Sequence, residues 1–379
     1  MFGIYIHFPY CIHKCFYCDF YSVEDFSTIN VFINSLLKEI EIASQYLIQS
    51  PPDIDTIYFG GGTPSLINPD YLEKILNQIG KFYKISDDTE ITLEVNPGTI
   101  DQKYLADYKS LGINRLSIGV QSFIESELQF LQRIHTVQES INTFNLARKI
   151  GFYNISLDII YNLPNQSINN VEYNINKVIE LSAEHISAYS LIYESGTPLQ
   201  KAVRQGKIVP LDEKIEENAF MFIIDKLEDS GYEQYEVSNF AKCGKKSRHN
   251  SKYWNYEPYI GFGPSAHSFI YPIRHWNSRS INKYIELLDR NKLPIQGDER
   301  ITLDKEIEEK IMLGLRSGGI DVDEFSTKYQ INIIHLLNDI YPNYDELIQI
   351  SKGKAKLTKR GYLLSDEIIL DLISKINNK

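Results

Sequence analysis

The sequence predicts an α/β protein in which a partial parallel barrel is followed by a smaller, mostly helical domain. Two observations carry this prediction. Strand-like and helix-like segments alternate regularly over the first half of the chain, and the strand-like segments are nearly continuous runs of Ile, Leu, Val and Tyr. Such runs are expected for parallel strands that are buried on both faces. Six strand–helix units predict a (β/α)6 partial barrel rather than a closed barrel of eight.

The expected elements follow in chain order. The strands are predicted at residues 3–8, 54–62, 90–98, 115–123, 155–164 and 185–193. The helices between them are predicted at residues 31–46, 69–83, 101–111, in segments up to 149, and at 168–182. Because each strand is followed by a helix and then by another strand, right-handed crossovers and parallel strands are expected.

Beyond Thr197 the pattern changes. A charged helix is predicted at 212–230, then irregular, aromatic-rich sequence to about residue 276, and then shorter helices. This change divides the chain into three expected parts. They are a barrel at 1–200, a barrel-completing extension at 201–289 and a C-terminal domain at 290–379.

The C-terminal domain is expected to be a small winged-helix-like unit. Its stretch "LTKRGYLLSD" (357–366) is interpreted as a helix end, a glycine break and a short strand. A winged helix often binds DNA, but the acidity of the chain argues against that role here.

Composition limits the classes of function. The chain has 379 residues, of which 43% are hydrophobic and 23% are charged, as in ordinary globular proteins. A formal charge of −11 argues against general binding to nucleic acid or anionic membranes. The N-terminal sequence lacks the features of a signal peptide, and no apolar run has transmembrane length. Four cysteines, three of them crowded together, do not form a disulfide framework, so we expect a reducing, cytoplasmic location.

Polar residues and glycines stand where the predicted strands end. Active sites of parallel barrels lie at this end of the strands. Taken singly, each of these residues would be a turn, a helix cap or a solvated charge, but their convergence on one rim favours a ligand site. The residues are Gly60, Gly61, Gly62, Thr63, Glu94, Gln121, Arg133 and Asp158.

The stretch "CIHKCFYC" (11–18) follows the first predicted strand. A structural zinc site would need four ligands. The three cysteines supply three, and His7 or His13 could complete the set, so a zinc site is an open alternative. Three thiolates on a [4Fe–4S] cluster would instead leave one iron without a protein ligand, which is useful only if a small molecule binds it.

The rim residues suggest what that small molecule is. The glycine-rich loop after the second strand would let a polar ligand approach the backbone closely. Glu94 could accept hydrogen bonds from a ribose or an amino group. S-adenosylmethionine (SAM) fits this description.

Six stretches in sequence order are "YIHFPYCIHKCFYCDF", "FGGGTPSL", "LEVNPGT", "LSIGVQSF", "LQRIH" and "LDIIYNLPNQ". Together they resemble the radical SAM proteins of the oxygen-independent coproporphyrinogen III oxidase group. The resemblance implies a radical SAM (β/α)6 partial barrel with a [4Fe–4S] cluster on Cys11, Cys15 and Cys18. It implies that the cluster-bound SAM is held by Tyr5, Gly61 and Glu94. It also implies a second SAM-sized pocket lined by Tyr17, Gly62, Thr63, Gln121, Arg133 and Asp158.

Two features separate the functions within this group. The oxidase carries a further cysteine two residues after the third cluster ligand, where this chain has Phe20. The chain also contains "HNSKYW" (249–254), which resembles a signature of the heme chaperones of the group. A histidine such as His249 can ligate heme iron, and Tyr253 and Trp254 can pack against a flat macrocycle. The alternative is an ordinary hydrogen-bonded histidine beside local core aromatics.

The resemblance therefore implies a heme chaperone that binds heme and transfers it to an acceptor protein of the respiratory chain. The alternative is the oxidase itself, which decarboxylates coproporphyrinogen III to protoporphyrinogen IX by SAM-dependent radical chemistry. Whether SAM is cleaved is left open. Cys243 is expected to be an inert residue rather than a heme-attaching thiol. A homodimer, and peripheral membrane association through the acceptor, are open alternatives.

Overall fold

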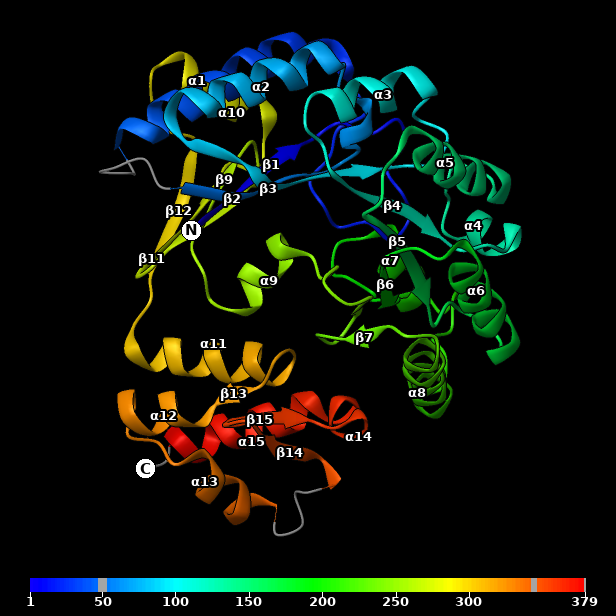
Figure 1. Ribbon diagram of the computed structural model, residues 1–379, viewed down its shortest axis with the longest axis vertical. Coiled ribbons are helices and arrows are strands. Elements are labelled where there is room, and N and C mark those ends of the chain that lie inside the picture. Colours follow the sequence, from blue (N-terminus) through cyan, green and yellow to red (C-terminus); the bar gives the residue numbers. More distant parts are fainter. Residues whose placement is uncertain (47–52, 342–345, 378–379) are drawn as a thin grey trace.

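A twelve-stranded mixed sheet forms the body of the protein in the computed structural model, which describes residues 1–46, 53–341 and 346–377 (Figure 1). Six consecutive strands at its centre are parallel neighbours, so the predicted βα units are confirmed. They are β1 (Phe2–Phe8), β2 (Asp53–Gly61), β3 (Lys84–Val95), β4 (Arg115–Gln121), β5 (Ile155–Tyr161) and β6 (His185–Ser190).

The helices between these strands cover the outer face of the curved sheet (Figure 1). They are α1 (Ile29–Tyr46), α2 (Pro69–Phe82), α3 (Gln102–Ser110), α4 (Glu125–Phe130), α5 (Val137–Ile150) and α6 (Ile168–Leu181). Their starts carry local capping signals. Asn68, Asp101 and Ser167 each accept a hydrogen bond from the first turn of the helix they precede, and Thr136 forms a reciprocal capping box with Glu139. These caps explain why the helix starts could be predicted within about two residues.

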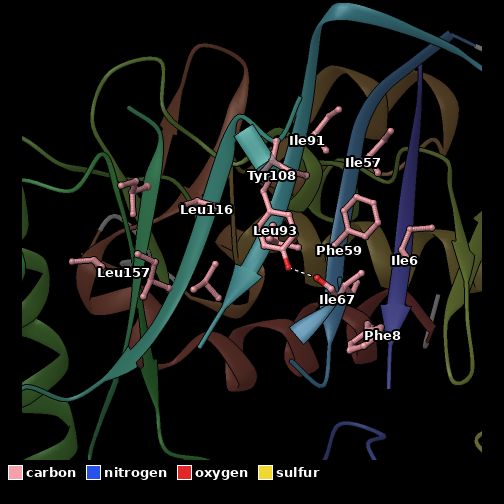
Figure 2. Close-up of a cluster of buried hydrophobic side chains, with 14 of the residues drawn as sticks. Ile6, Phe8, Ile57, Phe59, Ile67, Ile91, Leu93, Tyr108, Leu116 and Leu157 are labelled. Atoms are coloured by element: carbon pink, nitrogen blue, oxygen red, sulfur yellow. Dashed lines mark hydrogen bonds between the residues drawn. The ribbon is translucent and has the colours of Figure 1, made fainter. Parts of the chain in front are cut away.

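The central strands are buried on both faces, as predicted, with apolar residues on the outer face and mostly polar residues on the inner face. Figure 2 shows outer-face residues of neighbouring strands, including Ile6, Phe59 and Leu93, in one apolar layer with Tyr108 of α3. The alternate residues bind one another across the inner face: Tyr58 donates to Glu94 (2.9 Å), and Ser117 donates to Asp158 (3.1 Å). The inner face is therefore a polar surface on which a site can be built.

Residues 233–277 are regular, so the prediction of irregular sequence to about 276 is wrong. They form β7 (Glu233–Gln234), β8 (Asn239–Ala241), α9 (Arg248–Trp254), β9 (Tyr259–Phe262), β10 (His267–Ile270) and β11 (Ile273–Asn277). β9 lies parallel to β1, and β10, β11 and β12 (Ile295–Arg300) continue the sheet antiparallel beyond it. β8 and β7 extend the opposite edge beside β6.

Three further helices accompany this extension: α7 (Pro198–Arg204), α8 (Glu213–Asp229) and α10 (Ile281–Asp289). α8 confirms the charged helix predicted at 212–230. Among the described residues, no helix is both long and apolar enough to cross a membrane.

A separate hydrophobic core, beginning at Ile307, belongs to the C-terminal domain. This domain contains a three-stranded antiparallel sheet in the order β13–β15–β14. Its elements are α11 (Leu303–Leu315), β13 (Ile320–Asp321), α12 (Val322–Lys328), α13 (Ile333–Ile340), β14 (Ile348–Ser351), β15 (Lys354–Leu357), α14 (Lys359–Leu363) and α15 (Ser365–Asn377). Helices around one small sheet agree with the winged-helix-like expectation.

The local interpretation of "LTKRGYLLSD" is wrong. Thr358 caps α14, which continues through Gly361 instead of breaking there. The hypothetical Cβ of Gly361 would lie 2.0 Å from the carbonyl oxygen of Leu347, so this glycine allows close packing against the segment before β14.

Candidate functional site

The three clustered cysteines lie on the loop that leaves β1 at its C-terminal end. Cys11 N–H donates to the Val23 carbonyl (3.0 Å), which anchors the start of this loop, and Cys18 N–H donates to the Cys15 carbonyl (3.2 Å) in a turn within it. Cys11 is buried, whereas Cys15 and Cys18 are partly exposed, and all three are free thiols. The sequence-predicted ligands are therefore brought together on one short loop at the end of the barrel where the strands terminate.

The glycine triplet after β2 lies directly against this loop. The N–H groups of Gly62 and Thr63 donate to the carbonyls of Phe8 and Tyr10, each at 2.8 Å. A Cβ on Gly62 would lie 2.6 Å from the Tyr10 oxygen. The glycine is thus required by the close approach of two backbones, in addition to any role in binding a ligand.

Two side chains direct hydrogen-bond donors at the cysteine sulfurs. Thr63 Oγ1 donates to Cys11 Sγ, and Arg133 Nη1 donates to Cys15 Sγ, both at 3.4 Å. Asn96 joins these two side chains, because its Nδ2 donates to Thr63 Oγ1 (3.1 Å) and its Oδ1 accepts from Arg133 Nη2 (2.7 Å). A positively charged guanidinium beside the thiols favours a negatively charged thiolate assembly there.

Burial raises the pKa of the Cys11 thiol, and it raises the pKa of Cys18 to about 11. Hydrogen bonds and the charge of Arg133 act in the opposite direction at Cys11. Thiols that burial holds protonated need a metal centre to become thiolates, since metal ligation deprotonates a coordinating thiol.

The donor set fits a polynuclear iron–sulfur cluster better than a zinc ion. His7 cannot easily complete a zinc site, because its Nε2 bonds to the Tyr21 carbonyl (2.9 Å) and its Nδ1 to the Tyr5 hydroxyl (3.2 Å). His13 lies at the surface, 3.6 Å from Glu24. In the described ranges, no three His, Cys, Asp or Glu side chains, the three cysteines included, are arranged to hold a metal ion. Three thiols with two directed donors match the open-iron cluster described above.

Glu94 forms the second centre of the site. Its carboxylate accepts from the Tyr58 hydroxyl (2.9 Å) and from Gly61 N–H (3.2 Å). Burial raises the pKa of Glu94 to about 7, despite the opposing effect of these bonds. Tyr5 lies beside this pair, with its ring stacked 6.1 Å from that of Tyr58. The residues that the resemblance assigns to cluster-bound SAM therefore lie together, next to the glycine triplet.

The residues assigned to a second SAM pocket lie beside the cysteines or near Glu94. Thr63 and Arg133 lie beside the cysteines, and Gln121 ends β4 with a left-handed φ of 67°. Tyr17 lies against Arg133, whose charge opposes the rise that burial causes in the pKa of Tyr17. Asp158 lies within β5, where Ser117 and Ser156 each donate to its carboxylate at 3.1 Å, and, in addition to burial, its charge contributes to the raised pKa of Glu94.

The HNSKYW element forms α9, which packs on the inner face against the N-terminal parts of β1–β3. Glu90 accepts from the N–H groups of Arg248 (3.2 Å) and His249 (3.1 Å), so a carboxylate caps the helix start. Lys252 is 2% exposed. Its Nζ forms an ion pair with the Asp55 carboxylate at a distance of 2.8 Å, although the angle is not that of a hydrogen bond. The helix is therefore fastened to the strands by buried charges.

His249 is enclosed in this contact and is 1% exposed. Its Nδ1 bonds to Thr56 Oγ1 and its Nε2 to the Tyr253 hydroxyl, each at 2.8 Å. Burial lowers the pKa of His249 to about 3. Neither ring nitrogen is free for iron in this arrangement, so ligation of heme by His249 stays a prediction that requires α9 to rearrange.

Trp254 lines a cleft to which neither His249 nor Tyr253 contributes. This cleft of about 170 Å³ lies between α9 and the C-terminal domain, and Tyr256 and Phe325 also line it. The structure thus brings together only two of the three residues predicted to contact heme.

Tyr58, Thr56 and Glu90 were missed by the sequence analysis. Each lies on the inner face of β2 or β3 and binds a residue that the analysis did name. Polar residues at every second position of these strands could have indicated a polar inner face. The apolar residues between them instead led to the prediction of continuous apolar strands.

Comparisons with known proteins identify the family of this chain. Residues 5–178 match the model of the radical SAM superfamily. The chain is 36% identical to the heme chaperone HemW of Bacillus subtilis (strain 168), over 96% of this chain and 97% of that protein. It is 32% identical to the heme chaperone HemW of Lactococcus lactis subsp. lactis (strain IL1403), over 96% and 95%.

Among solved structures, the coproporphyrinogen III oxidase of Escherichia coli, described as a radical SAM enzyme, superposes with a TM-score of 0.84. The match covers 99% of this chain and 90% of that chain at 20% identity, so it shows the shared fold. The radical SAM domain implies a [4Fe–4S] cluster and SAM.

Proposed function

Because the chain belongs to the HemW heme chaperone family of radical SAM proteins, we propose that it binds heme and transfers it to an acceptor protein. The observation that carries this proposal is the similarity, over nearly the whole chain, to proteins named heme chaperone HemW from different bacteria. We further propose that the transfer occurs in the cytoplasm, and that the acceptor belongs to the respiratory chain. A homodimer, and membrane association through the acceptor, are compatible with this proposal.

We propose that Cys11, Cys15 and Cys18 hold the [4Fe–4S] cluster, because they are free thiols on one loop with donors from Thr63 and Arg133. When bound, such a cluster supplies an open iron and a one-electron redox centre. Arg133 would balance the negative charge of the thiolates, and Asn96 would hold Arg133 and Thr63 in place.

We propose that Tyr5, Gly61 and Glu94 bind the SAM at this cluster. The Glu94 carboxylate is turned toward Gly61 N–H, so the pair offers an acceptor for an amino or hydroxyl group beside the thiols. The second pocket, on Tyr17, Gly62, Thr63, Gln121, Arg133 and Asp158, is a weaker proposal because Asp158 is held by two serines.

For heme, the proposed contacts are His249, Tyr253 and Trp254. Of the three, Trp254 lines a cleft between α9 and the C-terminal domain. Ligation by His249 would have to break its bonds to Thr56 and Tyr253. The proposal that α9 takes part in heme binding therefore includes a movement of this helix.

The oxidase is the alternative function. Phe20 stands where the oxidase has a cysteine, and its side chain is 67% exposed. A phenyl ring supplies neither a hydrogen-bond donor nor a redox-active sulfur, so this position cannot perform what a thiol there would do.

One experiment separates the two functions. The protein, reconstituted anaerobically with iron and sulfide, is titrated with heme and then mixed with a heme-free acceptor, and a parallel sample receives coproporphyrinogen III, SAM and reductant. We expect stoichiometric heme binding, heme transfer and no protoporphyrinogen IX. Decarboxylation without stable heme binding would overturn the proposal in favour of the oxidase.

A further inference from the structure

A basic groove lies at the N-terminal end of the barrel, opposite to the cysteines. It is formed by β3 and by the segments that precede β4, β5 and α9, and its cavity measures about 520 Å³. We call it the basal groove. Its lining includes four cations, Lys109, Lys245, Lys246 and Arg248, and two acids, Asp88 and Glu90.

Three of the four cations are held by main-chain carbonyls rather than neutralised by close carboxylates. Lys109 donates to the carbonyl of Gly151, Lys245 to that of Tyr153 (3.3 Å), and Arg248 to that of Asp88 (2.6 Å). Arg248 also lies 3.9 Å from Asp55, and the hydrogen bond from Ser86, together with the charge of Arg248, lowers the pKa of the exposed Asp88. Only Lys246 forms a close pair, with Glu233 at 2.8 Å.

The two acids of the groove do not cancel this charge. Glu90 is 6% exposed, and its carboxylate is occupied by the first N–H groups of α9. Asp88 faces solvent and is bound by the hydroxyl of Ser86. The groove therefore has excess positive charge on a chain whose formal charge is −11. On such a chain, a basic groove favours an anionic ligand.

An aromatic surface lies beside the cations. The side chain of Tyr153 is 71% exposed, which is unusual for a large ring, while Phe152 is 1% exposed and supports the floor. Lys109 Nζ lies 5.1 Å from the ring centre of Phe152 and 5.9 Å from that of Tyr153. A ligand that binds here would meet a flat apolar face and ammonium groups side by side.

We infer that the basal groove binds heme, with the propionates on Lys109, Lys245 and Arg248 and one face of the macrocycle on Tyr153. This inference rests on the proposed function, which supplies heme as the ligand. Heme combines a planar apolar ring with two carboxylates, and this is the combination that the groove matches. Its volume also falls in the range of about 300–1,000 Å³ that is typical of small-molecule pockets.

The position of the groove links it to the heme-chaperone element. Arg248 lines the groove and is the first residue of α9, next to His249. Heme in the groove would thus contact the start of this helix without needing the buried imidazole. Because the cysteines lie at the other end of the barrel, heme and SAM could be bound at the same time.

The test compares two variants of the groove with a matched control. The double variant Lys109→Gln/Lys245→Gln removes two positive charges, and Tyr153→Ala removes the exposed ring. The control Lys207→Gln/Lys283→Gln removes the same charge from two exposed positions outside the groove. Each reconstituted protein is titrated with heme and, separately, with heme dimethyl ester, and the Soret absorbance is followed.

We expect the double variant to raise the dissociation constant of heme roughly tenfold, as expected for the loss of two partly exposed ion pairs. It should leave the affinity for the dimethyl ester unchanged, because the ester lacks the carboxylates. Tyr153→Ala should weaken both ligands, and the control should bind both like the wild type.

Wild-type affinity for heme in both groove variants would overturn the inference while the proposed function stands. Equal weakening in the control would also overturn it, because the effect would then come from overall charge. A wild-type protein that binds no heme would instead refute the proposed function, so the two failures are distinguishable.

Discussion

The two ends of the barrel are both polar, but they use their polar groups differently. At the C-terminal end, Cys15, Glu94 and Arg133 are partly exposed, and the Nε of Arg133 has no hydrogen-bond partner. At the N-terminal end, His249, Lys252 and Glu90 are 1%, 2% and 6% exposed, and each is bound to a polar partner. Polar groups with unused bonding capacity are typical of a ligand site, and fully paired ones of a structural contact.

This difference explains why a sequence motif is not by itself a binding site. The HNSKYW element carries the residue types that suit heme, yet its histidine joins α9 to β2 through Thr56. The basal groove lies at the same end of the barrel, but Lys109, Lys245 and Arg248 donate to main-chain carbonyls, so they keep charge available for a ligand. Four predictions test whether the two ends are as separate as this comparison implies.

The largest expected effect concerns the C-terminal end. The triple variant Cys11→Ala/Cys15→Ala/Cys18→Ala should lose all cluster iron, from about four irons per chain in the wild type, because no thiolate remains to bind it. Iron analysis and visible absorbance after anaerobic reconstitution measure this. Cys243→Ala, which removes the exposed fourth cysteine, should keep the full iron content. A triple variant that retained its cluster would refute the assignment of these ligands.

Glu94→Gln should weaken SAM binding next, without loss of iron. The substitution keeps the shape and an acceptor for Tyr58, but it removes the carboxylate charge beside Gly61. Hydrogen bonds to charged groups contribute about 1.5–3 kcal/mol, so the SAM dissociation constant should rise by roughly tenfold or more. The perturbation of the electron paramagnetic resonance spectrum of the reduced cluster by SAM gives the titration. An unchanged titration would remove Glu94 from the SAM site.

At the N-terminal end the expected effect is on stability. Lys252→Met leaves the Asp55 carboxylate, which is 15% exposed, with only a more distant cation, Arg248 at 3.9 Å, and it also removes the cation that pairs with Glu257. Breaking one side of a buried pair costs several kcal/mol, so we expect a loss of about 2–4 kcal/mol in the free energy of unfolding by urea. Lys246→Met breaks an exposed pair with Glu233 and should cost no more than about 1 kcal/mol. Equal losses in the two variants would mean that α9 is not fastened by buried charge.

Much of the fold was predictable because its signals are local. The six parallel strands, the capped helices and the cysteine loop are each encoded within a few tens of residues. The glycine triplet and Glu94 could be placed at one rim because parallel strands end together. The family resemblance added the roles of these residues, which no periodicity supplies.

The parts that were missed depend on contacts between distant segments. β9 has four residues, too few for a clear period, and it is a strand because β1, more than 250 positions earlier, offers it a free edge. The capping of α9 by Glu90 joins residues 158 positions apart. Neither the pairing of β9 with β1 nor the capping of α9 by Glu90 can be predicted from neighbouring residues in the sequence. The burial of His249, which decides what that residue can do, follows from both.

The smallest predicted effect is a change in slope, and it tests that burial directly. The pKa of His249 is about 3 in the folded chain, against about 6.5 for an unperturbed histidine in the unfolded one. Below pH 6.5 the imidazole of His249 therefore becomes protonated in the unfolded chain but stays neutral in the folded chain. The stability that the neutral imidazole contributes is present above pH 6.5 and is lost as the pH falls toward 3. One such proton contributes a slope of up to about 1.4 kcal/mol per pH unit.

His7 and His135, whose pKa values burial lowers to about 4, act in the same direction, so the difference between variants is the informative quantity. His249→Gln keeps a polar side chain but cannot titrate, and its unfolding free energy between pH 7 and pH 5.5 should fall less steeply than that of the wild type. Asn250→Ala, on the same helix, removes no proton-binding group and should keep the wild-type slope. Parallel curves for His249→Gln and the wild type would show that the imbalance in proton binding is absent. His249 would then be accessible enough to reach a heme iron, and the two ends of the barrel would be less different than their buried charges imply.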